Sequence, residues 1–254
     1  MAEVALARTR PAWGTTDRRD AWWLGPLVTL VVLSAFVIYA TARALINAHY
    51  QTGELLSPLY SPNLAEWTAL PRWLSPALAI LWAPAGFRLT CYYYRKAYYR
   101  AFTQHPPACG VAEGKRGEYC GETRFPLILQ NLHRYLLYFA LLFLVFLWHD
   151  VWKALWPGGR FGVTVGTLVL FANTSLLTFY TLSCHSFRHL IGGKLDCFSC
   201  SRRARTRYTL WQRLTSLNRN HMAWAWISLI SVTLADVYVR ALAVGLITDP
   251  AIYF

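Results

Sequence analysis

Apolar residues run through this 254-residue chain in five long stretches that are separated by shorter polar segments. The stretches cover about residues 22–48, 73–102, 127–156, 161–190 and 217–247. Each is long enough for the helix of about 20 residues that a bilayer core requires. Because that core offers the backbone no water, each stretch must pair its own N–H and C=O groups, as a helix does. The pattern predicts an all-α integral membrane protein, a single bundle of five transmembrane helices.

Basic residues fall mainly in the polar segments, and they set the predicted orientation. Several Arg residues precede the first stretch, in residues 1–21, and more Lys and Arg lie in the segments 103–126 and 191–213. Lys and Arg collect in short loops on the cytoplasmic side of a membrane. We therefore expect residues 1–21 to form a cytoplasmic tail, residues 22–254 to form one membrane domain, and the C-terminus to lie outside.

Composition agrees with this class of protein. The chain is 56% hydrophobic and only 15% charged, whereas soluble domains carry about 25% charged residues. The net charge is +13, and the Lys and Arg residues lie mainly between the apolar stretches. This placement favours roles in membrane orientation, contact with anionic lipid and docking of a partner over binding of nucleic acid. Most of the six cysteines fall at or beyond the predicted cytoplasmic ends, so we expect reduced thiols or metal ligands.

Two Cys and two His residues occupy the same predicted depth in helices two to five. Each of Cys91, His133, Cys184 and His221 lies within four residues of an Arg that marks the cytoplasmic boundary. An imidazole in the bilayer is costly unless it faces the bundle interior. Two thiolates and two imidazoles form the ligand set of a Rieske-type [2Fe–2S] cluster. We predict that these four residues bind such a cluster; the alternative is that they are unliganded.

Two further histidines leave the ligand assignment open. His185 and His189 are four residues apart, so a helix would place both on one face, close to Cys184. Either could replace His133 or His221 as a ligand. The alternative role of His189 is to cap carbonyl groups at the end of its helix.

Three residues are candidate donors to a quinone. Arg88 lies inside the second stretch, where a charge costs about 3 kcal/mol on insertion scales, and Tyr92 follows it by one helical turn. Arg134 adjoins His133 in the third stretch. Snorkelling of these cations to the interface is the alternative.

Other Cys and His residues suggest weaker metal sites. Cys197 and Cys200 form a CxxC, and with Cys109 and Cys120 they permit a zinc site of four thiolates or a set of reduced surface thiols. The outer ends of the first and third stretches carry one histidine each, which permits an outer haem b with two axial histidines. These two are His49 and His149.

Several runs of the sequence resemble the membrane-anchor subunit of actinobacterial succinate dehydrogenase, and the resemblance extends from about Ala21 to Asp249. The runs are Phe87-Arg88-Leu89-Thr90-Cys91-Tyr92-Tyr93-Tyr94-Arg95, Gly121-Glu122-Thr123-Arg124-Phe125-Pro126, Asn131-Leu132-His133-Arg134-Tyr135, Ser183-Cys184-His185-Ser186 and Asn218-Arg219-Asn220-His221-Met222. The resemblance implies a single five-helix chain in the bacterial plasma membrane that anchors a flavoprotein subunit and an iron–sulfur subunit. It also implies a membrane-embedded Rieske-type cluster and the reduction of menaquinone or ubiquinone.

We therefore expect a respiratory complex II anchor that passes electrons from an iron–sulfur partner to quinone. The chain has no strand and glycine turn that would bind a dinucleotide, so succinate oxidation belongs to another subunit. The alternatives are a di-haem cytochrome b anchor of the same complex, a structural anchor without metal, and a small transporter.

Overall fold

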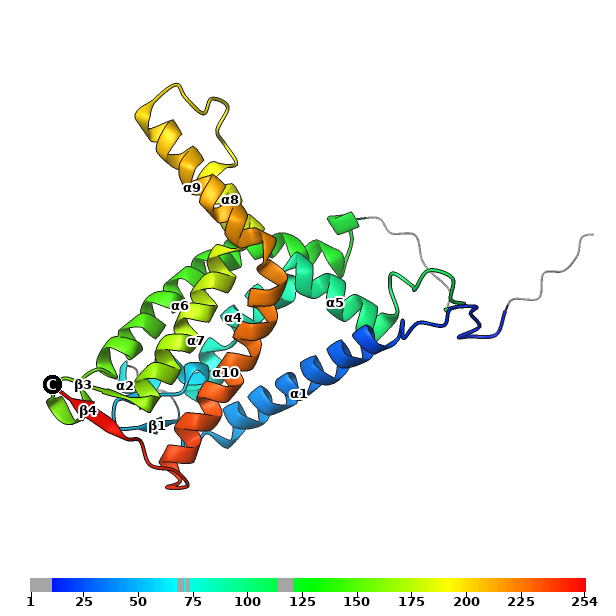
Figure 1. Cartoon of the computed structure of the whole chain (residues 1–254). Coiled ribbons are helices and arrows are strands. Elements are labelled where there is room, and N and C mark those ends of the chain that lie inside the picture. The colour runs from blue at the N-terminus through cyan, green and yellow to red at the C-terminus, as the bar shows by residue number, and fades with distance from the viewer. Residues whose placement is uncertain (1–10, 68–70, 72–73, 114–120) are drawn as a thin grey trace, which may run out of the picture.

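A computed structural model describes residues 11–67, 71, 74–113 and 121–254. Figure 1 shows long helices packed side by side, with the C-terminus at one end of the bundle and the N-terminal segment at the other. Within the described part, four helical segments are long and apolar enough to cross a membrane. They are α1 (Leu24–Ile46), α6 (His133–Lys153) with the 3-10 turn η3 (Leu127–Leu132) before it, α7 (Val165–Leu182) and α10 (His221–Ala243).

The second predicted span is not one helix, so the prediction of a continuous helix over 73–102 was wrong. It consists of α3 (Pro76–Ile80), α4 (Trp82–Thr90) and α5 (Tyr92–Thr103). Pro84 lacks an N–H group and crowds the carbonyl four residues earlier, which accounts for the first break. At the second break, Cys91 has extended backbone angles (φ −62°, ψ 128°).

The fourth and fifth predicted spans are also divided. Cys184 is extended (φ −65°, ψ 142°) and separates α7 from α8 (His185–Gly192). The segment 191–213, predicted as a loop, is largely helical, because α9 (Arg202–Arg219) begins at the N-cap Ser201 and leads into α10. The third span changes from η3 to α6 at His133.

Short elements close the ends of the bundle. They are β1 (Gln51–Thr52), β2 (Leu55–Leu56), η1 (Pro58–Tyr60), α2 (Leu64–Trp67), η2 (Gly121–Thr123), η4 (Pro157–Gly159), β3 (Gly162–Thr164) and β4 (Ala251–Tyr253). The strand pairs β1–β2 and β3–β4 are antiparallel. The regular structure of the described residues is therefore mainly helical, with two small antiparallel ribbons.

The N-terminal segment is fastened to the loop that follows α5. Gly14 N donates to Ala112 O over 2.7 Å, and Arg18 Nη1 donates to Cys109 O over 3.1 Å. Arg18 also donates to Asp20, and this hydrogen bond lowers the pKa of the Asp20 carboxyl. The described part of the tail is thus held against the end of the bundle that was predicted to be cytoplasmic.

A buried ion pair joins the elements at the opposite end. Asp236 on α10 is fully buried and accepts hydrogen bonds from Arg240 Nε at 2.8 Å, from Tyr39 Oη of α1 at 2.5 Å and from Ser57. Arg240 also donates to Ala48 O. One carboxylate thus connects α1, α10 and the loop after β2.

We expect Asp236→Ala to lower the free energy of unfolding by roughly 3–5 kcal/mol, because it leaves a buried guanidinium without its partner. Thermal unfolding of the detergent-solubilised protein measures the loss. Asp236→Ala combined with Arg240→Met should recover most of it, since the unpaired charge is then gone. An unchanged single variant would show that the pair is not important for stability.

The orientation itself remains a prediction that thiol labelling can test. Cys109 is exposed after α5, and Arg160 is exposed at the opposite end. In intact cells, a membrane-impermeant maleimide should label Arg160→Cys and leave Cys109 unlabelled until the membrane is opened. The variant Cys109→Ser identifies the labelled position, and the reverse labelling pattern would invert the topology.

Candidate metal centre

The four predicted metal ligands all lie where a helix begins. Cys91 is the N-cap of α5 and Cys184 is the N-cap of α8. His133 is the first residue of α6, and His221 is the first residue of α10. All four side chains are buried. The breaks in the predicted spans therefore occur at the residues with metal-binding chemistry.

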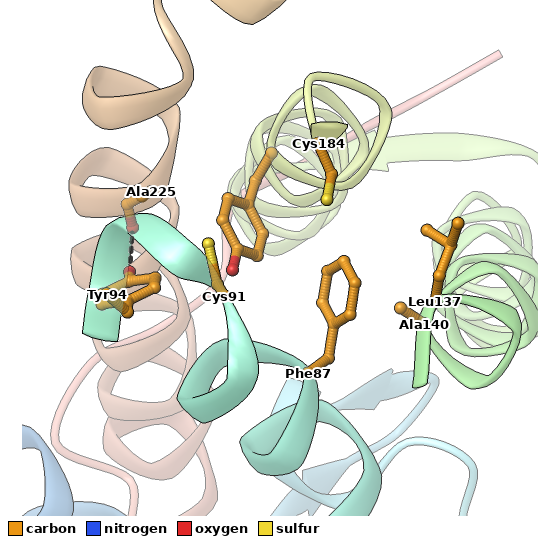
Figure 2. Close-up of a cluster of buried hydrophobic side chains, with 8 residues drawn as sticks. Phe87, Cys91, Tyr94, Leu137, Ala140, Cys184 and Ala225 are labelled. Atoms are coloured by element: carbon orange, nitrogen blue, oxygen red, sulfur yellow. Dashed lines mark hydrogen bonds between the residues drawn. The ribbon is translucent and has the colours of Figure 1, made fainter. Parts of the chain in front are cut away.

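The structure brings the four residues together as two Cys–His pairs. Cys91 Sγ lies 3.4 Å from His221 Nε2, and Cys184 Sγ lies 2.9 Å from His133 Nε2. Both thiols belong to one buried cluster of side chains, in which Figure 2 shows Phe87 and Tyr94 beside them and Leu137 and Ala140 on α6. All four predicted ligands line one cavity of about 550 Å³.

Each imidazole is fixed through its other nitrogen. Thr90 Oγ1 lies 3.1 Å from His133 Nδ1, and Ser183 Oγ lies 2.6 Å from His221 Nδ1. A hydroxyl that accepts a hydrogen bond from Nδ1–H leaves the lone pair on Nε2, the nitrogen that faces a sulfur in both pairs. Partners of this kind orient metal-binding histidines in other proteins.

An aromatic ring covers each imidazole as well. The Phe87 ring stacks on His133 with the centroids 4.5 Å apart and an interplanar angle of 9°. The Tyr180 ring stacks on His221 at 5.2 Å and 16°. Both imidazole planes are thus held by packing as well as by a hydrogen bond.

These supporting residues belong to a repeated five-residue pattern, aromatic-x-Leu-hydroxyl-Cys. It occurs as Phe87-Arg88-Leu89-Thr90-Cys91 at the end of α4 and as Tyr180-Thr181-Leu182-Ser183-Cys184 at the end of α7. In each copy the ring and the hydroxyl support one histidine, and the cysteine faces the other histidine. Sequence reasoning missed this pattern, although comparing the residues before the two cysteines would have found it.

The alternative ligands lie outside the two pairs. His185 and His189 are both exposed on α8, although His185 also lines the cavity. Among the described residues, no group of three or more His, Cys, Asp or Glu converges on a position for a single ion. A [2Fe–2S] cluster needs two protein ligands on each of its two irons, so it does not require three ligands around one ion.

The three predicted quinone residues do not share one cavity. Tyr92 and Arg134 line the cavity of the four candidate ligands. Arg88 lines a second, largely apolar cavity of about 380 Å³ between α1, α4, α6 and α7. Phe87 and Tyr180 also line the second cavity, so the two spaces lie on opposite sides of the rings that stack on the histidines.

Arg88 is held by α10 rather than turned toward the interface. Its Nη1 atom donates to Tyr94 Oη at 2.6 Å and to Ala225 O at 3.2 Å, and Nη2 donates to Ser228 Oγ at 2.9 Å. The guanidinium also lies 4.5 Å from the centre of the Tyr180 ring. The chain therefore places a satisfied cation next to the candidate ligands.

The remaining candidates do not form a second centre among the described residues. His49 and His149 are exposed, which gives little support to an outer haem. Cys197 and Cys200 form a disulfide, contrary to the expectation of reduced thiols, because the turn between α8 and α9 brings their Cα atoms within 5.8 Å. Cys109 is free and exposed, and Cys120 lies outside the described residues.

Comparisons with known proteins agree with the sequence resemblance. The family model for actinobacterial succinate dehydrogenase subunit SdhC matches residues 24–245. A chain of the solved Mycobacterium smegmatis Sdh1 complex in the apo form is 42% identical, with a TM-score of 0.85 and 98% of each chain covered. No curated protein matches the chain. The protein described here belongs to the actinobacterial succinate dehydrogenase SdhC family of membrane-anchor subunits.

Proposed function

We propose that this subunit carries electrons from an iron–sulfur partner subunit to a quinone through a Rieske-type [2Fe–2S] cluster held by Cys91, His133, Cys184 and His221. The main support for this proposal is that the Nε2 atoms of His133 and His221 each face a cysteine sulfur inside one cavity. Family membership supplies the context, because the similar chain belongs to a succinate dehydrogenase complex. A bound cluster would supply one-electron transfer.

The chemistry of the donors fits this cofactor. Two thiols and two imidazoles match the ligand set by type and number. The hydroxyl of Tyr180 is fully buried and lies beside the Cys91 thiol, and the Tyr180 ring stacks on His221. A buried donor is costly without a good acceptor, and a thiolate sulfur at Cys91 would accept a hydrogen bond from it.

The backbone favours negative charge at the same place. The N-termini of α5, α6, α8 and α10 all meet the cavity of the four candidate ligands. The N–H of Ser186 already donates to Cys184 Sγ at 3.4 Å. Helix N-termini stabilise anions, so the starts of α5 and α8, which follow extended residues, would stabilise thiolates and the electron that the site receives.

The two cavities suggest where the partners of the reaction lie. The lining of the cavity with Tyr92 and Arg134 includes the charged residues Lys96 and Glu122, which suits contact with an iron–sulfur subunit. The second cavity is apolar and has one cation at its end, Arg88, which suits a quinone with an isoprenoid tail. There the quinone would take two electrons and two protons to become quinol.

The assembly follows from the same proposal. A flavoprotein subunit oxidises succinate, and an iron–sulfur subunit docks on the end of the bundle where α5 and α6 begin. That end is the cytoplasmic face of a bacterial plasma membrane in the predicted topology. The chain itself contributes the quinone site and the last electron carrier.

Replacing both thiols should separate this proposal from haem and from a metal-free anchor. We expect Cys91→Ser with Cys184→Ser to lower the iron and labile sulfide of the purified complex by the content of one [2Fe–2S] cluster and to remove the Rieske-type electron spin resonance signal, because hydroxyls bind iron poorly in place of thiolates. Quinone reduction should be lost, while succinate oxidation with a soluble artificial acceptor persists.

The control for this experiment is Cys109→Ser, which removes an exposed thiol outside the cavity. A b-type haem spectrum that survives the double substitution would favour the di-haem alternative. Equal metal content in the unmodified and doubly substituted complexes would contradict the ligand assignment.

The hydroxyls of Thr90 and Ser183 should control how well the histidines bind the cluster. We expect Thr90→Val and Ser183→Ala each to weaken iron retention or activity roughly 10- to 100-fold, the usual cost of losing a partner of a metal-binding histidine. The nitrogen hyperfine couplings of the reduced cluster and the reduction potential of the cluster provide independent measurements. Thr90→Ser keeps the hydroxyl and should behave like the unmodified protein.

Thr181→Val is the matched control, because Thr181 is buried two residues before Ser183 on the side of the apolar cavity. If Thr181→Val perturbs the hyperfine couplings as strongly as Ser183→Ala, the effect is general repacking of α7. Unchanged couplings in both hydroxyl variants would remove the positioning role.

A further inference from the structure

The segment between Cys184 and His221 forms a helical hairpin outside the bundle. α8 and α9 pack against each other, and Figure 1 shows them leaving the bundle sideways, across the direction of α6, α7 and α10. With those three helices as the membrane spans, this direction would place the hairpin along the membrane surface.

Internal contacts make this hairpin a rigid arm. Arg188 Nε donates to Thr215 Oγ1 at 2.9 Å, and Arg207 Nε donates to Ile191 O at 2.7 Å. The Arg188 guanidinium lies 4.1 Å from the centre of the Trp211 ring. At its base, Asn218 Nδ2 donates to Ser183 O at 2.5 Å. The arm therefore keeps one orientation relative to the spans.

The arm holds much of the positive charge of the chain. Residues 185–219 contain eight Lys and Arg residues and one Asp, a formal charge of +7 out of the total of +13. The side chains of Arg202, Arg203, Arg205 and Arg213 are exposed. A surface with this charge attracts anionic partners.

One flank of α9 is apolar. Leu210, Leu214 and Leu217 recur at intervals of four and three residues, so they lie on one face of the helix. Leu210 is exposed and the other two are half-buried. Arg203 lies two turns before Leu210 on the same face, and the opposite flank carries Arg205 and Gln212.

We propose that the α8–α9 hairpin binds the membrane surface, with the leucine flank of α9 in the interface and Arg202, Arg203 and Arg213 on anionic phospholipid headgroups. An apolar face bordered by arginines is the composition of helices that lie in the membrane interface. The sideways position of the arm and its charge favour this partner over a protein. The proposal is independent of the metal cofactor.

Two labelling positions on opposite flanks test the orientation of the arm. A nitroxide is attached at Leu210→Cys or at Gln212→Cys in the complete complex, reconstituted in bilayers of phosphatidylglycerol and phosphatidylcholine. The label at 210 should be accessible to oxygen in the lipid, and the label at 212 to a water-soluble nickel chelate. The complex without a new cysteine gives the background, and equal aqueous accessibility at both positions would overturn the proposal.

Charge removal tests the headgroup contact. We expect Arg202→Gln, Arg203→Gln and Arg213→Gln each to lower the preference of the delipidated complex for phosphatidylglycerol over phosphatidylcholine about fivefold. The matched control removes three charges outside the proposed lipid-binding flank, with Arg124→Gln, Arg160→Gln and Arg205→Gln on the opposite flank of α9, and should keep the preference.

Two results would overturn the assignment of this flank. One is an unchanged lipid preference in the triple variant of Arg202, Arg203 and Arg213. The other is loss of the iron–sulfur subunit from that variant during gel filtration, which would make the flank a subunit interface. Spectra of the complex check that the variant still folds.

Discussion

The candidate metal centre depends on helices that are interrupted at one depth. A helix break inside a membrane leaves backbone N–H groups without partners, and such breaks occur only where the protein or a polar cavity surrounds them. Here the breaks at Cys91 and Cys184 are buried and face a cavity whose lining includes polar and charged side chains. The helix breaks therefore present two buried thiols to the cavity, leave backbone N–H groups free to donate there, and place helix N-termini around it. If α4 and α5 formed one continuous helix, Cys91 would lie along the side of that helix and not at the start of α5.

The repeated aromatic-x-Leu-hydroxyl-Cys pattern explains how two distant segments build one centre. Each copy supports one histidine with a ring and a hydroxyl, and each presents its cysteine to the other histidine. A displacement of α4 or α7 would therefore disturb both pairs together. Arg88 connects α4 to α10 through Ala225 O and Ser228, which ties the first copy to the helix that carries His221.

Much of the site could be predicted from the sequence, because Arg residues near each boundary give the depth of a neighbouring Cys or His. The helix breaks could not, since no Pro or Gly stands at Cys91 or Cys184 to mark an interruption. The pairing of Arg88 with α10 is a contact between distant segments, which local pattern does not encode. The helix α9 was mistaken for a loop on its charge, although Ser201 as an N-cap and the spacing of Tyr208, Trp211 and Thr215 indicated a helix.

The two ends of the bundle have different physical constraints. At one end, the buried Asp236–Arg240 pair joins α1, α10 and the loop after β2, so these elements cannot separate without exposing a charge to lipid. At the other end, polar side chains surround a cavity of about 550 Å³. Because the ion pair fixes how α1 and α10 meet, the cavity end can accept breaks and polar groups that would loosen a bundle held only by apolar packing. The ion pair at one end of the bundle therefore allows interrupted helices and a polar site at the other end.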